Sequence, residues 1–382
     1  MQIVFISNYY NHHQAKLCQA LNRLLNGNFV FLETEPMEQE RISLGWGESD
    51  RPDYIWKSYE SQEMAQKAQD LVDRADVAIY GCGPFEMLKT RLKNGKLTLW
   101  YSERIHKQGD GPAYKWPLRR VRYWLEFGRF PEFYLLCASA YAAWDFARAG
   151  TFKNKAYRWG YFPEAKQYDV SALIDSKEPG SILWVGRLID WKHPEKAVLV
   201  AERLKQDGIP FRMTMVGSGE LETSIRQMIQ DKGLEKEITM TGSVPAAQVR
   251  SYMERAETYL FTSDRNEGWG AVMNEAMNSA CGVVASHSIG AAPFLGKHEE
   301  NCLLYRDSDF EDLYRKTCAM VQSPNLRRKL GEKAYRTICN MWNADMAAER
   351  LVKLCENLLR KEFVCEEEGP CSKAEVLPDN WF

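Results

Sequence analysis

The sequence predicts an α/β protein with two doubly wound domains, each a parallel sheet covered by helices, facing a central cleft. A chain of 382 residues is long enough for two domains. Short apolar runs alternate with longer amphipathic stretches in both halves, the pattern of strands separated by helices. The hydrophobic content of 45% and aromatic content of 12% indicate packed cores rather than disorder.

The first half contains four expected strands, residues 2–7, 29–32, 76–80 and 97–101. Helices are expected over residues 14–25 and 62–74, because apolar side chains recur there at helical spacing. A polar loop, residues 8–13, follows the first strand, and Gly81 to Pro84 ends the third. These segments predict a parallel sheet for the first domain.

The alternation restarts after Lys177-Glu178-Pro179-Gly180, whose composition predicts a linker. Strands are expected at residues 181–185, 211–216, 238–241, 258–261 and 282–285, and helices at 194–206, 220–232, 246–255 and 269–279. We therefore expect domains over residues 1–176 and 177–341. Residues 342–382 are expected to form a C-terminal helix that crosses back to the first domain. After residue 362 an acidic tail is expected as a loop or frayed end.

Composition excludes several classes of protein. A net charge of −2 gives no global field that favours nucleic acid. Ten cysteines lack zinc-binding spacing, and Cys365 and Cys371 are expected either to pair or, more in keeping with the cytosol, to stay free thiols. The strand-like start is no signal peptide, and no run approaches the roughly 20 apolar residues that span a bilayer. We expect a cytoplasmic protein with no nucleic-acid partner.

The segment from residue 266 to 275 places two carboxylates, Glu267 and Glu275, across the junction between a strand and a helix. Gly268 and Gly270 allow close approach of a ligand to the backbone, and N–H groups at a helix start favour anions. This arrangement suits a ligand that carries both hydroxyls and phosphates. The alternative is an ordinary acid at a helix N-terminus, with a solvated Glu275.

Four expected strand ends in the second half carry residues suited to a ligand. Arg187, with its planar fork, and Lys192, with its point charge, form a suitable pair for two phosphates. A single glycine after a strand is usually only a turn. Four such ends on one sheet edge instead indicate a binding site.

These motifs resemble the family-4 retaining glycosyltransferases of the GT-B fold. The matching pieces are Gly186-Arg187-Leu188 with Lys192, Val216-Gly217-Ser218-Gly219, Thr241-Gly242, and the Glu-x7-Glu pair Glu267–Glu275. The resemblance is strong from residue 181 to 336 and covers the first half only in outline. His193 departs from it, because the family usually has glycine after the lysine.

The resemblance implies a site for a nucleotide-diphosphate sugar with UDP or GDP as the nucleotide. Arg187 and Lys192 would hold the diphosphate and Glu267 the sugar hydroxyls, and these three are the implied catalytic residues. Glu275 would accept hydrogen bonds from the ribose. The other implied donor-binding residues are Gly186, Gly217, Thr241, Gly242, Ser243, Gly268, Trp269, Gly270 and Ala271.

The implied reaction is a retaining, hexosyltransferase-like transfer that needs no metal or other cofactor, because cationic side chains and helix N-termini stabilise the leaving diphosphate. Asp307-Ser308-Asp309 lies beyond the motifs and is interpreted as a loop or cap. No second carboxylate is placed as a covalent nucleophile, so a front-face route is expected. The alternatives are a GT-B disaccharide phosphorylase and a non-catalytic nucleotide-sugar-binding protein.

The first domain is expected to bind the acceptor, a glycan or a lipid-linked glycan of bacterial surface-polysaccharide or glycolipid assembly. The candidate residues are Asn8, Asn11, His12 and His13 after the first strand, and Glu103 after the strand at 97–101. The two histidines can position an acceptor hydroxyl. The alternative is a polar loop whose side chains cap a helix.

A basic and aromatic stretch from residue 115 to 129 is the other notable feature of the first half. Lys115, Arg119, Arg122 and Arg129 share one face at helical spacing. Beside them lie Leu118, Val121 and Leu125, and Trp116, Tyr123 and Phe127 flank the opposite side. This pattern is typical of a helix that binds an anionic membrane surface, here the inner face of the cell membrane. The alternative is a core helix with solvated or paired arginines.

Overall fold

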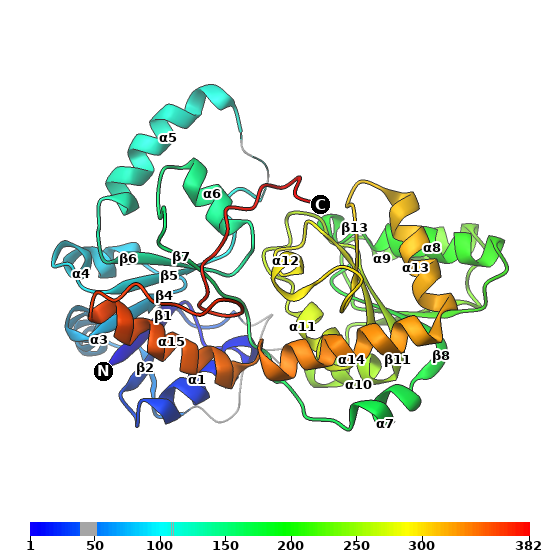
Figure 1. Ribbon diagram of the computed structural model, residues 1–382, viewed down its shortest axis with the longest axis horizontal. Helices are drawn as coiled ribbons and strands as arrows, with labels where there is room; N and C mark the ends of the chain where they lie inside the picture. Colours follow the sequence, from blue (N-terminus) through cyan, green and yellow to red (C-terminus); the bar gives the residue numbers. More distant parts are fainter. Residues whose placement is uncertain (39–51, 108, 110) are drawn as a thin grey trace. The chain divides into compact units, whose positions relative to one another are not determined.

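The computed structural model describes residues 1–38, 52–107, 109 and 111–382. The chain forms two compact units: unit 1 comprises Met1–Glu164 and Trp342–Trp381, and unit 2 comprises Ala165–Met341 and Phe382. Each unit contains one parallel sheet with helices packed on it (Figure 1). The predicted class, two Rossmann-like α/β domains, is confirmed.

Unit 1 contains a seven-stranded sheet of order β3-β2-β1-β4-β5-β6-β7. Its strands are β1 (Ile3–Ser7), β2 (Phe29–Glu33), β3 (Ile55–Lys57), β4 (Val77–Tyr80), β5 (Thr98–Ser102), β6 (Phe133–Cys137) and β7 (Ala156–Arg158). Central β1 pairs with both β2 and β4, and all five of its residues are buried. A strand covered on both faces reads as a continuous apolar run, as this one does.

The helices of unit 1 include one from the far end of the chain. They are α1 (His12–Leu24), α3 (Gln62–Arg74), α4 (Lys89–Lys93), α5 (Trp116–Tyr123), α6 (Ala142–Arg148) and α15 (Ala344–Leu359), with the short turns η1 (Phe85–Leu88), η2 (Ala113–Lys115) and η3 (Trp124–Gly128). Helix α15 packs along α1, and Arg23 of α1 forms an ion pair of 2.6 Å with Asp345.

The C-terminal tail is a loop, one of the two expected forms, but it is not frayed. The N–H of Cys371 donates to the carbonyl of Arg158 at 2.8 Å, and the N–H of Arg158 donates to Ser372 at 2.7 Å. This segment therefore pairs with the open edge of β7, whose backbone groups would otherwise lack partners. All ten cysteines are free, so Cys365 and Cys371 form no disulfide.

Unit 2 contains a six-stranded parallel sheet of order β10-β9-β8-β11-β12-β13. Its strands are β8 (Glu178–Val185), β9 (Arg212–Val216), β10 (Ile238–Gly242), β11 (Ala256–Phe261), β12 (Gly282–Ser286) and β13 (Leu303–Tyr305). Its helices are α7 (Val170–Asp175), η4 (Asp190–Lys192), α8 (Pro194–Gln206), α9 (Glu222–Asp231), α10 (Ala246–Arg255), α11 (Val272–Asn278), α12 (Ala292–Leu295), α13 (Phe310–Gln322) and α14 (Pro324–Asn340).

The predicted linker at residues 177–180 is instead part of the folded unit. The ammonium of Lys177 is buried and donates to the carbonyls of Met253 at 3.1 Å and Ala256 at 2.9 Å, and β8 begins at Glu178. Gly180, with φ of +71°, accommodates an irregular start of the strand. The proline and glycine thus mark a distorted strand end rather than a break between domains.

The order of the strands in unit 2 reverses between β8 and β11. From β8 the chain proceeds outward through β9 to β10, and it then returns to the other side of β8 with β11. Since the sheet is parallel, the loops that follow β8 and β11 lie at the same edge. In open α/β sheets this switch point is where ligands bind.

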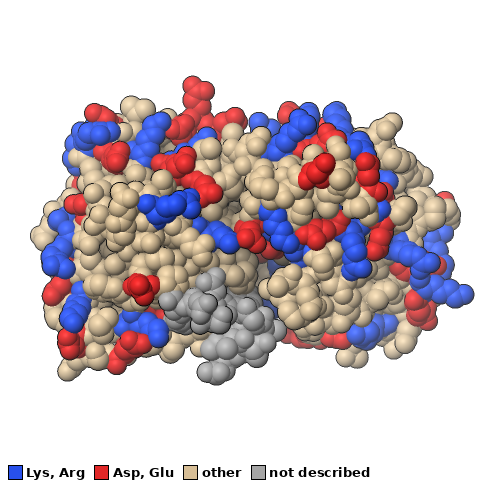
Figure 2. Space-filling view, turned by 90° about the horizontal axis from the view of Figure 1, so that it is seen from below, with Lys and Arg blue, Asp and Glu red and all other residues tan. Residues whose placement is uncertain are grey.

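The surface carries both positive and negative side chains, and the described helices are too short or too polar to cross a membrane. In Figure 2, Lys and Arg alternate with Asp and Glu on the face that is drawn, in keeping with the net charge of −2. Over the described ranges, every helix falls short of the length and apolarity that crossing a bilayer requires.

Candidate functional site

An ion pair joins the loops that follow β8 and β11. The ammonium of Lys192, in η4, bonds Oε2 of Glu267, in the β11–α11 loop. The two side chains are only 15% and 13% exposed. The hydroxyl of Ser263 donates to the same carboxylate oxygen at 3.0 Å. Two predicted site residues, 75 positions apart, are therefore in direct contact at the switch point.

Further hydrogen bonds fix η4 against the β11–α11 loop. The N–H of Asp264 donates to the carbonyl of Trp191 at 3.0 Å. The hydroxyl of Thr262 donates to the carbonyl of Lys192 at 2.7 Å and accepts from the indole of Trp184 at 2.8 Å. Sequence reasoning missed Thr262 and Asp264, because nothing in their spacing indicates partners in another loop.

Arg187 is the exposed cation of this edge. It follows Gly186 at the end of β8, and its guanidinium lies 5.6 Å from the ring centroid of Trp191. Among the described residues no carboxylate lies within ion-pair distance of it. Its fork of donors is thus available to an anion beside Lys192.

Gly217 allows the β8 and β9 loops to approach each other. It adopts a φ of +132°, and a Cβ atom there would lie 1.9 Å from the carbonyl oxygen of Gly186. The N–H of Gly217 donates to the carbonyl of Gly242 at 2.9 Å. No other residue type fits this position without moving the backbone.

The end of β10 lies beside these loops. The hydroxyls of Ser243 and Ser218 are 2.5 Å apart, and the Thr241 hydroxyl donates to the Gly242 carbonyl at 2.9 Å. The predicted residues at the ends of β8, β9 and β10 thus lie at one edge of the sheet.

Helix α11 begins at Val272, three residues later than the predicted start at 269. The difference follows from Gly270, whose φ of +92° is outside the helical region and whose Cβ position would lie 2.6 Å from the ring of Phe261. Trp269 is a core residue, 1% exposed, and its indole donates to Asn274 at 2.9 Å.

The backbone around Glu267 is held by the segment that follows β12. The N–H of Gly290 donates to the carbonyl of Glu267 at 3.2 Å, and the N–H of Ala291 donates to the carbonyl of Trp269 at 3.0 Å. Gly268 is buried within this loop, and Ala271 directly precedes α11. Gly290 and Ala291 were not predicted as part of the site. The signal for them was a glycine soon after the predicted strand at 282–285, like those after the other strands of this half.

Glu275 lies in the first turn of α11 rather than two turns along it. Arg250 of α10 is 3.9 Å from its carboxylate and 6% exposed. Burial raises the pKa of Glu275, and the charge of Arg250 opposes that shift. Apart from its place on an amphipathic helix, nothing in the sequence indicates that Arg250 lies near Glu275.

In unit 1, helix α1 begins at His12, so the histidines are not in a loop as predicted. Asn11 is the N-cap and accepts from the N–H of His13 at 3.0 Å. Burial, assisted by the charge of His12, lowers the pKa of His13 to about 3. His13 is therefore neutral at pH 7. The carbonyl of Asn8 accepts from Thr34 at 3.0 Å.

Glu103 lies in the same neighbourhood as His13. Its carboxylate accepts from the hydroxyl of Tyr161 at 3.0 Å and pairs with Lys107 at 2.6 Å. The ring of Tyr161 lies 6.0 Å from that of His13. The structure therefore groups His12, His13, Tyr161 and Glu103 beyond the first and fifth strands of unit 1.

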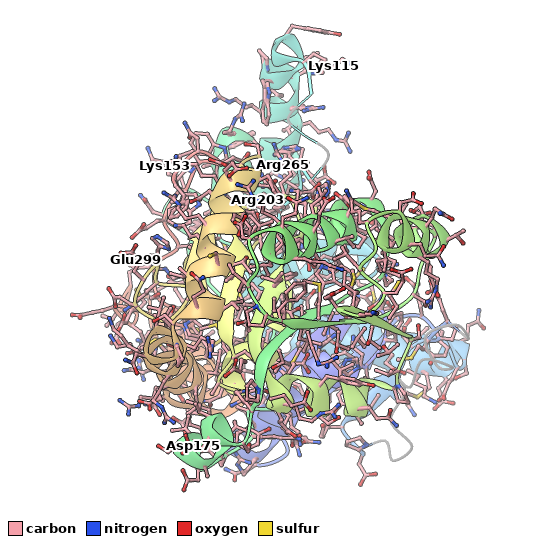
Figure 3. All side chains as sticks on the ribbon, turned by 90° about the vertical axis from the view of Figure 1, so that its right-hand side faces the viewer. Lys115, Lys153, Asp175, Arg203, Arg265 and Glu299 are labelled. Carbon is pink, nitrogen blue, oxygen red and sulfur yellow. The ribbon has the colours of Figure 1, made fainter. Side chains whose placement is uncertain are left out.

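The predicted basic helix is α5 with η3, and it does not lie in the core. Every described side chain of α5 is at least partly exposed, and α5 stands out from unit 1, with Lys115 at its start (Figures 1 and 3). The exposed apolar side chains lie at helical spacing: Tyr114 (76%), Leu118 (77%), Val121 (59%), Trp124 (52%) and Leu125 (48%).

The aromatic residues predicted to flank α5 face inward instead. Trp116 packs on the ring of His106 at 5.3 Å and under the guanidinium of Arg148 at 4.6 Å. Tyr123 contacts Phe127, which is only 8% exposed. These three side chains attach α5 to unit 1, and the aliphatic stripe remains outside.

Asp307 and Asp309 have structural partners. Asp309 is the N-cap of α13 and accepts from Asp312 at 2.9 Å, whereas Asp307 pairs with Lys196 at 3.0 Å. Within the part of the chain that the structure describes, no group of three His, Cys, Asp or Glu side chains is arranged to hold a metal ion.

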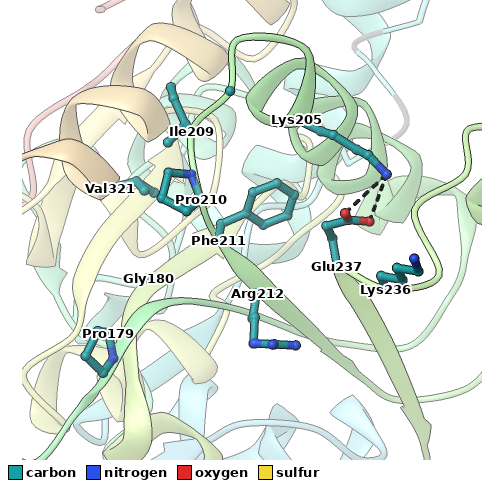
Figure 4. Close-up of a pocket in the computed structure, with 11 residues that line it drawn as sticks. Pro179, Gly180, Lys205, Ile209, Pro210, Phe211, Arg212, Lys236, Glu237 and Val321 are labelled. Atoms are coloured by element: carbon teal, nitrogen blue, oxygen red, sulfur yellow. Dashed lines mark hydrogen bonds and ion pairs between the residues drawn. The ribbon is translucent and has the colours of Figure 1, made fainter.

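A separate cavity of about 690 Å³ lies at the opposite edge of the unit 2 sheet, where β8 and β9 begin (Figure 4). Phe211 and Pro210 line it, and Lys205 pairs with Glu237 at its rim at 3.1 Å. It is remote from the strand ends that carry the predicted site.

The family model for glycosyl transferases group 1 matches residues 170–337. The amylovoran biosynthesis glycosyltransferase AmsK of Erwinia amylovora is 30% identical over 42% of this chain and 40% of its own. The poly(ribitol-phosphate) alpha-N-acetylglucosaminyltransferase of Staphylococcus aureus is 26% identical over 44% of this chain and 34% of its own. The aligned regions thus span less than half of these relatives.

Solved structures agree over nearly the whole chain. Anabaena HepE, in a complex with UDP, has a TM-score of 0.69 at 14% identity and covers 94% of this chain and 100% of its own. TarM of S. aureus, in a mutant complex with UDP, has a TM-score of 0.65 at 12% identity over 93% of this chain and 100% of its own. Residues 170–337 thus match the model of the glycosyl transferases group 1, within a chain that has the GT-B fold.

Proposed function

We propose that the protein is a retaining, metal-independent glycosyltransferase that moves a sugar from a nucleotide-diphosphate sugar to a hydroxyl acceptor. One observation carries the proposal: Lys192 is paired with Glu267 at the switch point, with the exposed Arg187 beside them. Cations for a diphosphate and a carboxylate for sugar hydroxyls are thus adjacent.

In the proposed step the bond between the anomeric carbon and the diphosphate oxygen breaks. Arg187 and Lys192 stabilise the negative charge that develops on the leaving diphosphate. The acceptor oxygen bonds to the same face of the sugar, and its proton passes to the leaving phosphate oxygen. Glu267 orients the sugar through its hydroxyls, and Glu275 accepts from the ribose.

The names of similar proteins support the substrate class. Structures of Anabaena HepE hold UDP, UDP and glucose, or UDP-glucose. Relatives that align with less than half of this chain are described as glycosyltransferases of amylovoran and colanic acid biosynthesis. We therefore propose a UDP-sugar, with a GDP-sugar as the second choice, and a polysaccharide or lipid-linked glycan acceptor in the cytoplasm.

A donor screen tests this proposal. The protein is incubated with UDP- and GDP-sugars, and release of the nucleotide diphosphate is measured with and without glycan acceptors. Lys192→Gln should abolish turnover, whereas the matched control Lys205→Gln, at the remote cavity, should not. Turnover with orthophosphate but without nucleotide sugar would identify a phosphorylase. Nucleotide-sugar binding without hydrolysis or transfer to any acceptor would identify a binding protein.

We further propose that the enzyme works at an anionic membrane surface, which α5 and η3 contact. Residues 114–130 contain five Lys or Arg and one Glu, a net charge of +4. The exposed stripe of Leu118, Val121 and Leu125 lies among these cations. An apolar stripe bordered by basic residues suits the interface of an anionic bilayer. A lipid-linked acceptor would then be presented at the same surface.

Vesicle sedimentation tests this place of action. The protein should bind phosphatidylglycerol vesicles, not phosphatidylcholine vesicles, and salt should release it. Changing Lys115, Arg119, Arg122 and Arg129 to Ser should abolish binding, since each basic residue is worth roughly 1 kcal/mol at such a surface. Leu118→Ser with Val121→Ser should weaken it, but the matched control Phe363→Ser with Val364→Ser should not. Self-association through the stripe without vesicle binding would contradict the proposal.

A further inference from the structure

His193 adopts a backbone conformation that its side chain does not favour. Its φ is +49°, in the left-handed region, and it directly precedes Pro194, the first residue of α8. The left-handed region costs an ordinary residue roughly 1–2 kcal/mol, and a residue before proline prefers an extended backbone. Glycine, usual at this position in the resembling family, takes this conformation freely. A histidine here therefore needs a compensating role for its side chain.

The imidazole of His193 bridges two carboxylates on different elements. Its Nδ1 lies 2.7 Å from Oε1 of Glu195, in the first turn of α8. Its Nε2 lies 3.4 Å from Oδ2 of Asp264, in the loop that carries Glu267. Asp264 also accepts from the N–H of Asn266 at 2.7 Å. The ring thus ties the start of α8 to the turn of the β11–α11 loop.

We propose that His193, as an imidazolium, is a positioning residue of the donor site that holds the loop bearing Glu267 against the turn bearing Lys192. The inference rests on the proposed function of that pair. When the ring is neutral, the charges of Glu195 and Asp264 are no longer compensated beside the place of the diphosphate. Donor affinity then falls for two reasons, loss of the bridge and repulsion of the anion.

The charges around the ring make the bridge dependent on pH. The hydrogen bonds to Asp264 and then Glu195 raise the pKa of His193 to about 9, whereas burial and Lys196 oppose the shift. The N–H of His193 donates to the carbonyl of Asp190, in η4, at 3.1 Å. Because the folded pKa exceeds the ordinary value near 6.5, the bridge contributes fully below about pH 6.5 and is lost as the pH rises through about 9.

Calorimetric titration with UDP tests the inference in the whole 382-residue chain. His193→Asn removes the charge and tolerates the left-handed backbone, and His193→Gly also removes the strain. Both should bind UDP about tenfold more weakly at pH 7.5, as expected for loss of charge-assisted bonds. Between pH 7.5 and 10, the affinity of the wild type should fall toward that of His193→Asn. Any effect of pH that the two proteins share cancels in the ratio of their affinities.

A partner variant separates positioning from mere stability. Asp264→Asn should weaken UDP binding similarly, and the double variant with His193→Asn should show little additional loss, because the two residues act as one unit. Parallel pH profiles for wild type and His193→Asn, or a lowered melting temperature with unchanged UDP affinity, would overturn the inference.

A stability measurement keeps this inference distinct from the proposed function. If the wild type binds neither UDP nor GDP, the proposed function fails. The bridge itself is then tested by the melting temperatures of wild type and His193→Asn. Their difference should shrink as the pH rises through about 9, and a constant difference would show that the imidazolium makes no bridge.

Discussion

The two glutamates of the Glu-x7-Glu pair differ in how firmly the structure holds them. Glu267 lies in a loop and is fixed by Lys192 and the hydroxyl of Ser263. Glu275 lies on a helix, and its nearest cation, Arg250, is 3.9 Å away. A carboxylate held by direct bonds is preorganised, whereas a loosely paired one adjusts to its ligand. We therefore expect Glu267 to control turnover and Glu275 to contribute mainly to binding.

The largest effect is expected for Glu267→Ala. Loss of one preorganised polar group at a reacting centre costs about 10²–10³-fold in kcat. UDP should still bind, because the proposed partner of Glu267 is the sugar. Turnover and calorimetric UDP affinity, measured side by side, check this split. A variant that loses UDP affinity and turnover in equal measure would show that Glu267 serves the nucleotide.

Arg187→Ala should have the next largest effect, on the bare nucleotide diphosphate. Hydrogen bonds to a charged group are worth about 1.5–3 kcal/mol, which corresponds to a UDP affinity lowered roughly ten- to hundredfold. Removal of an exposed side chain should leave the melting temperature without ligand unchanged. Normal UDP binding by this variant would mean that the diphosphate site lies elsewhere.

Glu275→Gln should have a smaller effect on UDP affinity, about 1 kcal/mol for hydrogen bonds to the ribose. The amide keeps an acceptor and relieves the burial of a charge, so folding should persist. Comparison of UDP with 2′,3′-dideoxy-UDP checks the assignment, since the variant and wild type should bind the dideoxy nucleotide equally. A thousandfold loss of turnover would remove the contrast between the two glutamates.

Chelation should have the smallest effect. Because the proposed charge stabilisation comes from Arg187 and Lys192, EDTA should leave turnover unchanged. Loss of activity that manganese or magnesium restores would contradict this expectation. It would direct attention to Asp307 and Asp309 despite their present partners.

The sequence predicted β1, β2, β4 and β5 of unit 1 and β8 to β12 of unit 2, because buried parallel strands are continuous apolar runs such as Ile3–Ile6. It missed β3, β6, β7 and β13. The alternation of helices with these runs also predicted the fold class. The predicted starts of α11 and β8 were wrong, because a glycine sets the backbone conformation at each of them. Gly270 delays α11, and Gly180 lies within a distorted strand rather than a linker.

The loops of the candidate site were predictable in kind but not in their contacts. Parallel strands carry Arg187, Lys192 and Glu267 to one edge, so their shared location follows from topology. The Lys192–Glu267 pair and the bridge from His193 to Asp264 depend on how two loops of different length meet. Side chains in such loops have no periodicity, so the sequence gives no signal of their pairing.

The pairing of residues 371–372 with β7 has a practical consequence for handling the protein. A shortened version that ends after α15, at about residue 362, would uncover the backbone groups of Arg158 on an edge strand. Unpaired strand edges recruit other chains, so this version should aggregate although every predicted site residue is retained. Residues 363–382 therefore protect the edge of β7 from association with other chains. An affinity tag should follow these residues and not replace them.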